Sequence, residues 1–230
     1  MSGARVPVVF VDLDGTVLRD RAGRRAMLGA VEDVAGRPAG DADRATFTGR
    51  TDAFIAAELL RRAGHPADPE GVARVHARYL ERLAEGLAVH GCVALPGALE
   101  LGHALAAAAR EGRCKTPLLL TGNLREGARR KLEACRLLEV YGHAGAFGDR
   151  HVDRIDVARE ALAMAGDARP VVIGDAPADL RAARAVGARC VLVATGPVPA
   201  DELAALHPDV LLDSLADVAR ALEALLGSDS

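Results

Sequence analysis

Two aspartates, Asp12 and Asp14, stand two residues apart directly after a short apolar run, in the segment VVFVDLDGTV. Carboxylates at the end of a buried strand are costly unless they hold a cation or take part in a reaction. Residues i and i+2 point the same way while a strand persists, and Gly15 lets the chain turn sharply after Asp14. The pair predicts a reactive carboxylate site, although a polar strand end before a turn would give the same letters.

A second group of polar residues, Thr121, Gly122 and Asn123, follows another apolar run in LLLTGNL. A hydroxyl and backbone N–H groups at the start of a helix suit a phosphate group. An ordinary helix cap would produce the same pattern. The segment therefore predicts a phosphate cradle or a cap.

A third strand end repeats this arrangement in VVIGDAPADL, with Asp175, a turn through Pro177, and Asp179 at the start of a helix. A loop acid followed by a helix cap is the simpler interpretation. Open α/β sheets, however, bind their ligands at the carboxyl ends of their strands. Three strand ends with matching chemistry together predict a site for a phosphate and a cation.

The elements that must position these residues alternate as strands and helices, which is typical of a parallel α/β sheet. We expect a Rossmann-like parallel sheet core with an inserted α-helical cap domain. The predicted strands are Val6–Val11, Pro117–Leu120, Pro170–Ile173, Cys190–Ala194 and Asp209–Leu212, and the predicted core helices are Ala98–Arg110, Leu124–Cys135, Asp153–Ala165 and Ala178–Val186.

The insertion lies between the first and second strands, where more than a hundred residues are too many for one crossover. We predict a core over 1–17 and 94–230 and a helical cap over 18–93, with linkers near Leu18–Arg21 and Gly91–Pro96. The cap helices are expected at Arg24–Ala35, at Asp52–Ala63 and after Asp68, where Pro69 takes the first helical position.

In this arrangement the chain resembles the haloacid dehalogenase superfamily, in its phosphatase branch with a helical cap, which includes phosphoglycolate phosphatase and β-phosphoglucomutase. The resemblance covers nearly the whole chain and rests on DLDGT, TGN and GDAPAD, and the cap segment GRTD at Gly49–Asp52 is also similar. It implies a magnesium-dependent phosphoric monoester hydrolase that acts on a small phosphorylated metabolite.

The resemblance also implies roles for the four aspartates. Asp12 would attack phosphorus and form an aspartyl phosphate, and Asp14 would act as general acid and base. Mg²⁺ would be held by the carboxylates of Asp12 and Asp175 and by the backbone carbonyl of Asp14, with Asp179 ordering these ligands. Thr121 and the Gly122 N–H would bind phosphoryl oxygens.

The family's Lys-Pro motif is missing, which leaves two candidates for the cation that binds phosphate. Arg154 begins the helix that leads into the strand of Asp175, and we expect it to take this role. Lys131 is the family's residue type, but it lies about two turns, roughly 12 Å, beyond the start of the helix after Thr121. We expect its side chain to be stretched, and the residue without the role to be an exposed helix charge.

In the cap, Arg50, Thr51 and Asp52 are expected to face the nucleophile and read the leaving group when the cap closes. Capping of the helix at Asp52–Ala63 is the alternative role for these residues.

Composition narrows the function class. With a net charge of -3 and a pI near 6.2, the chain lacks the basic surface that binds nucleic acid. No apolar run approaches a membrane span or a signal-peptide core. We expect a cytoplasmic monomer or homodimer with reduced, structural cysteines.

Two other functions stay open: a phosphomutase of the same superfamily, and a catalytically weak binding or regulatory protein on this fold. A cofactor-free dehalogenase is disfavoured, because it would not use Asp14 or a magnesium site.

Overall fold

The computed structural model describes residues 5–40, 47–142 and 144–227. The other residues, which include parts of the predicted core and cap ranges, lie outside the described residues. Six parallel strands form a central sheet in the order β5-β4-β1-β6-β7-β8, with the bounds β1 (Pro7–Val11), β4 (Leu118–Leu120), β5 (Gly145–Ala146), β6 (Arg169–Gly174), β7 (Arg189–Val193) and β8 (Val210–Leu212).

Strand β1 lies in the middle of the sheet and pairs with β4 on one side and β6 on the other. All five of its residues are buried, and successive side chains alternate between two hydrophobic clusters. Val9 and Val11 belong to one cluster, and Val8 and Phe10 belong to the other. This alternation follows from the two-residue period of a strand, and it shows that both faces of the sheet are covered.

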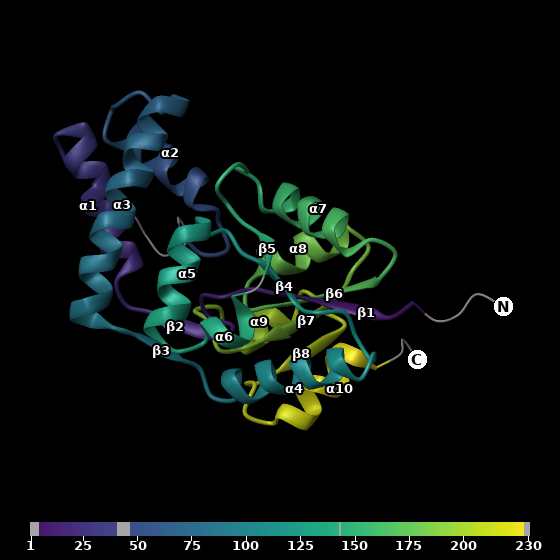
Figure 1. Ribbon diagram of the computed structural model, residues 1–230. Helices are drawn as coiled ribbons and strands as arrows, with labels where there is room; N and C mark the ends of the chain where they lie inside the picture. The colour runs from purple at the N-terminus through teal and green to yellow at the C-terminus, as the bar shows by residue number, and fades with distance from the viewer. Residues whose placement is uncertain (1–4, 41–46, 143, 228–230) are drawn as a thin grey trace.

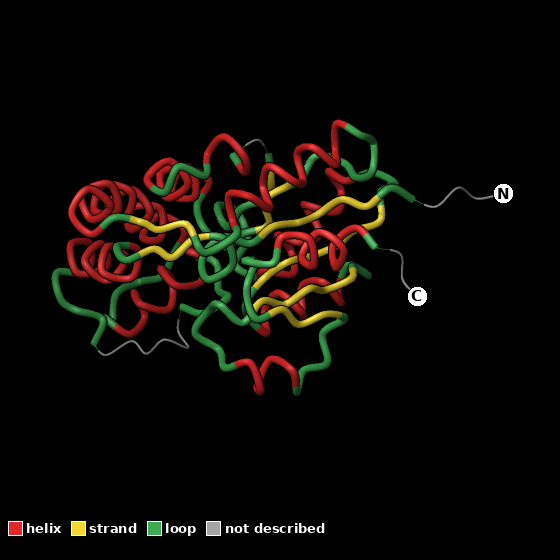
Figure 2. Tube along the Cα trace, turned by 90° about the horizontal axis from the view of Figure 1, so that it is seen from below, coloured by secondary structure: helices red, strands yellow, loops and turns green. Residues whose placement is uncertain are grey.

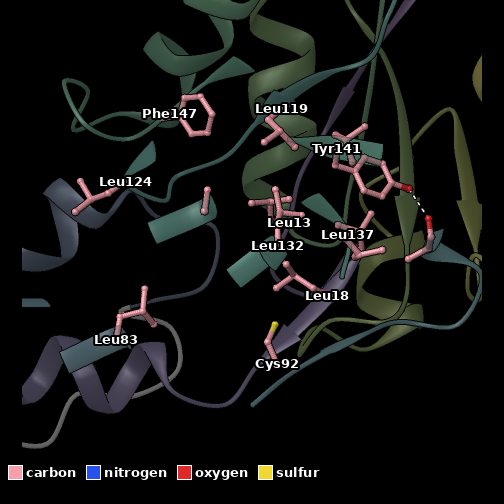
Figure 3. Packing of buried hydrophobic residues seen from close by; sticks show 14 of the residues in the cluster. Leu13, Leu18, Leu83, Cys92, Leu119, Leu124, Leu132, Leu137, Tyr141 and Phe147 are labelled. Atoms are coloured by element: carbon pink, nitrogen blue, oxygen red, sulfur yellow. Dashed lines mark hydrogen bonds between the residues drawn. The ribbon is translucent and has the colours of Figure 1, made fainter. Parts of the chain in front are cut away.

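Helices cover the two faces, with α7 and α8 on one side and α4 and α10 on the other (Figure 1). On the second face, Leu13, Leu119 and Leu132 belong to one contiguous cluster (Figure 3). At its edge, the hydroxyl of Tyr141 donates to the carbonyl of Ala98 at 2.6 Å. The helices of this part of the chain are α4 (Ala98–Arg110), α5 (Arg125–Ala134), α6 (Leu138–Tyr141), α7 (Arg154–Ala165), α8 (Pro177–Ala185), α9 (Ala200–Ala204) and α10 (Val218–Leu226).

Three helices fall in the region predicted to be the cap, and we call them the cap: α1 (Gly23–Ala35), α2 (Asp52–Arg62) and α3 (Pro69–His90), which lie together beside the sheet (Figure 1). Thr51 caps α2 by accepting the N–H of Phe54, and Asp68 caps α3 by accepting the N–H of Gly71. Helix α3 also packs on α5 of the core, and there Arg130 donates to the carbonyl of Leu80 at 2.7 Å. The cap is therefore docked on the core.

The two predicted linkers contain a short antiparallel ribbon of β2 (Leu18–Asp20) and β3 (Cys92–Ala94). In Figure 2 this ribbon lies between the cap helices and the sheet. Leu18 and Cys92 are buried and join the same hydrophobic cluster, which explains why these segments are ordered. We call the pair β2 and β3 the hinge ribbon, because it carries the chain into and out of the cap.

The predicted fold class is confirmed, and the sheet has one strand more than the five that we predicted: the two-residue β5. The division into core and cap stays a prediction, with its inner boundaries at the start of β2 and within β3. The four cysteines are free thiols. None of the described helices is long and apolar enough to cross a membrane.

Candidate active site

Three neighbouring strands, β4, β1 and β6, end at one edge of the sheet and deliver the three predicted motifs there. Asp12 follows β1, Thr121 follows β4 and Asp175 follows β6. All three side chains are buried and line a cavity of about 220 Å³ between the core and the cap. The parallel sheet thus brings together side chains that are far apart in the sequence.

Asp12 is paired with Arg154, which comes from the first turn of α7. The guanidinium Nη2 lies 2.6 Å from Asp12 Oδ1 and also 2.6 Å from Asp179 Oδ1, and it donates to the carbonyl of Leu120 at 3.1 Å. Burial raises the pKa of Asp12, and the charge of Arg154 opposes this rise. Arg154 therefore lies at the carboxyl edge of the sheet, and its expected role as the phosphate-binding cation stays a prediction.

Asp12, Asp175 and Asp179 bring carboxylate oxygens within 4.8 Å of one another. Asp179 Oδ2 accepts the N–H groups of Asp175 and Ala176, so this carboxylate is held firmly. The buried hydroxyl of Thr16, which sequence reasoning did not single out, lies 3.5 Å from Asp12 Oδ2 and 3.3 Å from Asp175 Oδ1. This arrangement is a cluster of acids that share few donors.

The electrostatics of this cluster are unbalanced. Burial raises the pKa of Asp175 well above its ordinary value, and the negative charges of Asp12 and Asp179 raise it further. Arg154 is one positive charge for three carboxylates. Like charges at this spacing in a buried site favour a bound cation. The donor set is carboxylate oxygen, the kind of ligand that hard divalent ions prefer, so these residues fit a divalent metal.

Gly15 allows the strand ends to approach this closely. Its φ of 91° is left-handed, and a Cβ at this position would collide with the carboxylate of Asp175. Glycine is therefore required both for the turn after Asp14 and for the space beside Asp175.

Asp14 points to a different set of partners on the other side of the cavity. Lys131 Nζ lies 3.1 and 2.9 Å from its two oxygens, and Asn123 Nδ2 donates to Asp14 Oδ2 at 2.7 Å. Burial raises the pKa of Asp14, and Lys131 opposes this rise. The Asp14 side chain keeps 37% of its exposure, so a leaving group can reach it.

The prediction that the Lys131 side chain would have to stretch to reach the site, or would be exposed, was wrong. Its side chain is not stretched or solvent-exposed but is buried in the cavity wall, where Nζ also donates to Asn123 Oδ1 at 2.7 Å. Helix α5 begins beside the cavity and turns the Lys131 side chain inward, which a distance along the helix axis cannot reveal. Although burial alone would lower the pKa of Lys131, the carboxylates of Asp14 and Asp20 raise it well above its ordinary value.

Asp20, the last residue of β2, is a part of this site that sequence reasoning missed. Its carboxylate lies 3.1 Å from Lys131 Nζ and accepts the N–H groups of Ala22 and Gly23 at 2.7 and 2.8 Å. A single acid within a predicted linker carries no sequence signal for such a role. Only the folding of the hinge ribbon against α5 brings it to Lys131.

Thr121 is suited to bind a phosphoryl oxygen. Its hydroxyl oxygen accepts from Asn123 Nδ2 at 2.7 Å, so its own proton can be donated to a ligand. The adjacent Gly122 also lines the cavity, and a Cβ there would collide with the backbone of Arg50 in the cap. Asn123 itself orders Thr121 and Asp14 rather than presenting free donors to a ligand.

The three cap residues take different positions. Arg50 lines the cavity and stacks on the ring of Phe54 at 4.6 Å. The hydroxyl of Thr51 caps α2 and also donates to the carbonyl of Val152 at 2.8 Å, which ties the cap to the core. Of the three, Arg50 is the best placed to contact a substrate.

Asp52 does not cap α2, which Thr51 caps, but binds the loop that follows β4. Its carboxylate accepts the N–H of Leu124 at 2.8 Å, its own N–H donates to the carbonyl of Gly122 at 2.7 Å, and it lines the cavity. Burial raises the pKa of Asp52 to about 6, while Lys131 opposes the rise. The start of α2 is thus fastened to the Thr121 loop.

One segment of the chain is similar to a known family. Residues 146–218 match a family model described as HAD-hydrolase-like. No curated protein matches the chain at a significant level.

Several solved structures share the fold. CbbY from Rhodobacter sphaeroides in complex with xylulose-1,5-bisphosphate is 25% identical, with a TM-score of 0.69 and coverage of 93% of this chain and 96% of that one. A predicted phosphoglycolate phosphatase from Haemophilus somnus is 17% identical, with a TM-score of 0.68 and coverage of 94% and 97%. A protein from Bacteroides vulgatus proposed to be a β-phosphoglucomutase is 22% identical, with a TM-score of 0.69 and coverage of 99% and 93%. The family model covers residues 146–218, and the solved structures share the fold over nearly the whole chain, so both agree with the resemblance that the motifs indicate.

Proposed function

We propose that this haloacid dehalogenase-like hydrolase is a magnesium-dependent phosphatase that acts on a small phosphorylated metabolite through an aspartyl phosphate on Asp12. One observation carries the proposal: Asp12 and Asp175 meet beside Thr121 and Arg154 at the ends of three adjacent strands, and Asp14 stands across the same cavity. This set contains a nucleophile, an acid, phosphate donors and acidic ligands for a metal.

The charge balance supports a metal as part of the function. A phosphate dianion would meet the carboxylates of Asp12, Asp175 and Asp179 in a buried site with Arg154 as their counter-charge. Repulsion at such distances is several kcal/mol unless a cation compensates it. Mg²⁺ held by Asp12, Asp175 and the Asp14 carbonyl would supply that charge and polarise the phosphoryl group.

The chemistry of the chain's own residues follows. A carboxylate oxygen of Asp12 forms a bond to phosphorus as the bond to the leaving oxygen breaks, and Asp14 gives that oxygen a proton. Asp14 then takes a proton from water, whose oxygen attacks phosphorus and releases Asp12 and inorganic phosphate. The Thr121 hydroxyl and Arg154 hold the phosphoryl oxygens during both steps.

The cavity dimensions favour a small substrate. The space around Asp12 is about 220 Å³, and a neighbouring cavity of about 570 Å³ shares Asp14 and Arg24 with it. The second space lies on the Asp14 side and can hold the leaving group. The cap provides Arg24 and Arg50 at the walls, so the cap would read the leaving group.

A panel of phosphorylated metabolites, assayed for phosphate release with Mg²⁺ and with EDTA, tests the proposal. We expect hydrolysis of at least one small monoester with Mg²⁺ and none by Asp12→Asn. Transfer of the phosphoryl group within a sugar phosphate, without release of phosphate, would indicate the mutase instead. The proposal would be contradicted if no monoester of the panel released phosphate, or if hydrolysis were equally fast in metal-free buffer.

A further inference from the structure

The ammonium group of Lys131 is fully committed within the protein. An ammonium has three N–H donors. Its three partners are the carboxylate of Asp14 at 2.9 Å, Asn123 Oδ1 at 2.7 Å and the carboxylate of Asp20 at 3.1 Å. A phosphoryl oxygen could bind Lys131 only by displacing one of these partners.

Arg154 differs in this respect. Its Nη2 atom contacts Asp12, Asp179 and the carbonyl of Leu120, but its buried Nε has no hydrogen-bond partner among the described residues. A guanidinium offers five donors in a fixed plane, and Arg154 lines the cavity. Arg154 thus keeps one donor without a partner among the described residues, whereas Lys131 is surrounded by three polar partners.

The third partner of Lys131 connects the site to the hinge ribbon. Asp20 ends β2, immediately before the cap, and its two oxygens also accept the N–H groups of Ala22 and Gly23 at the start of α1. A Cβ at Gly23 would collide with the Asp20 carboxylate and lie 3.4 Å from Lys131 Nζ. The side chains of Tyr79 and Asp52 also line this wall of the cavity.

We propose that Lys131 and Asp20 are positioning residues for Asp14: the Lys131 ammonium holds the Asp14 carboxylate over the cavity and ties it to the start of the cap, while phosphate binding falls to Arg154. This inference rests on the proposed function, because it needs Asp14 to exchange protons with the leaving group and with water. It assigns Lys131 a role through Asp14 instead of contact with phosphate, and it adds Asp20 to the site.

The substitutions follow from this geometry. Lys131→Met removes the ammonium but keeps the length of the chain, Lys131→Arg keeps the charge, and Asp20→Asn removes only the hinge partner. Arg129→Ala is the matched control, because Arg129 is exposed on the same helix and pairs with Glu126 and Glu133. Thermal unfolding of each variant separates loss of fold from loss of rate, and Asp20→Asn keeps the test valid if Lys131→Met does not fold.

Two substrates with different leaving groups reveal the role of Asp14. Release of an alkoxide needs a proton from Asp14, whereas release of p-nitrophenolate hardly needs one. With an alkyl monoester, we expect Lys131→Met to lower kcat at least about tenfold with KM changed less than about threefold, and Lys131→Arg to recover part of the loss. With p-nitrophenyl phosphate, phenolate should appear in a burst, because attack by Asp12 is retained and activation of water is slowed.

Binding of inorganic phosphate in the presence of Mg²⁺ distinguishes positioning from a phosphate clamp. By calorimetry, the Kd for phosphate should stay within about threefold for Lys131→Met and Asp20→Asn and rise at least about tenfold for Arg154→Ala. In an Asp14→Asn background, Lys131→Met should lower the rate by less than about threefold more, since it acts through Asp14.

The outcomes distinguish failure of this inference from failure of the proposed function. If Lys131→Met weakens phosphate binding as much as Arg154→Ala does, or lowers the rate equally with and without Asp14, Lys131 is a phosphate clamp and the inference is overturned. A wild-type chain that hydrolyses no monoester overturns the proposed function itself, and the inference with it.

Discussion

Each side of the cavity pairs buried or half-buried carboxylates with one cation, but the two sides differ in how many hydrogen-bond partners the protein provides. On the Asp12 side, one arginine serves Asp12 and Asp179, Asp175 has burial and like charges raising its pKa, and Arg154 Nε is unpartnered within the described residues. On the Asp14 side, Lys131 Nζ donates to Asp14 and Asn123 and forms an ion pair with Asp20. The acids of the first side share few donors within the protein, whereas Asp14 and Asp20 on the second side also accept N–H groups from Asn123, Ala22 and Gly23.

This difference suggests that the metal and the phosphate bind on the Asp12 side, and that the Asp14 side positions the general acid. The Asp12 side is built from strand ends and helix starts of the core, and it holds an excess of negative charge that a divalent metal would offset before a phosphate binds. The Asp14 side includes Asp20 of the hinge ribbon, so its geometry depends on how the cap is seated. Substitutions on the first side should change binding and chemistry, and those on the second side should change proton transfer.

The largest effect is expected for Asp12→Asn. The amide is nearly isosteric but cannot attack as an anion, so kcat should fall on the order of a thousandfold or more while thermal stability is kept. Phosphate release assays check the rate, and Asp201→Asn, at an exposed carboxylate, is the control. More than a few per cent of wild-type activity would contradict the role of Asp12.

Removal of metal should come next in size. EDTA should abolish hydrolysis, and added Mg²⁺ should restore it, because the acids of the Asp12 side repel a phosphate dianion without a cation. Asp175→Asn should weaken Mg²⁺ binding, measured by calorimetry on the protein without substrate. Equal binding of Mg²⁺ by the variant and the wild type would rule out Asp175 as a ligand.

Arg154→Ala should lower kcat at least about tenfold, which corresponds to about 1.4 kcal/mol of transition-state stabilisation. Arg154→Lys should recover part of the rate, because it keeps the charge but loses the planar fork. Arg159→Ala, exposed on the same helix and paired with Asp156, is the control. Unchanged kcat in folded Arg154→Ala would show that phosphate is held elsewhere.

The smallest effect concerns Asp52, which fastens the cap to the Thr121 loop. Its pKa is raised from 3.8 to about 6, so its contribution to stability is greatest at low pH and declines as pH rises through this interval. Asp52→Asn keeps an oxygen for the Leu124 N–H and does not ionise. Each pK unit corresponds to about 1.4 kcal/mol. Between pH 4 and 7, we expect the free energy of unfolding of the variant to rise relative to that of the wild type by on the order of 1 kcal/mol.

Urea unfolding of both proteins across this pH range measures the difference. A variant whose stability relative to the wild type does not rise between pH 4 and 7 would show that the Asp52 carboxylate is not held in the way described.

How far the sequence predicts this site depends on which forces place each residue. Asp12, Thr121 and Asp175 follow buried strands, and parallel strands carry whatever follows them to one edge, so their meeting could be predicted. Lys131 could not be placed in this way, because the direction of its side chain depends on how α5 turns against the sheet. The position of Asp20 depends on the pairing of β2 with β3. Each of these strands has three residues, which is too short a segment to predict a strand from its sequence.

The same contrast holds for the fold. Long amphipathic helices such as α3 and the buried strand β1 are specified by local pattern, and the start of α3 and the bounds of β1 were predicted closely. The two-residue β5 is defined by pairing with β4 rather than by its own sequence, Gly145 and Ala146, so it was missed. The positions of residues that depend on partners distant in the sequence cannot be predicted from local sequence pattern.

The most direct measurement of the central claim is mass spectrometry of the protein quenched in acid during turnover with Mg²⁺ and a substrate found by the panel. A phosphoryl group should appear on the peptide that carries Asp12, at a level that rises when Asp14→Asn slows attack by water, and it should be absent from Asp12→Asn. Steady hydrolysis by the wild-type protein with no phosphoryl group on Asp12, under conditions in which the Asp14→Asn protein also remains unlabelled, would contradict the covalent mechanism.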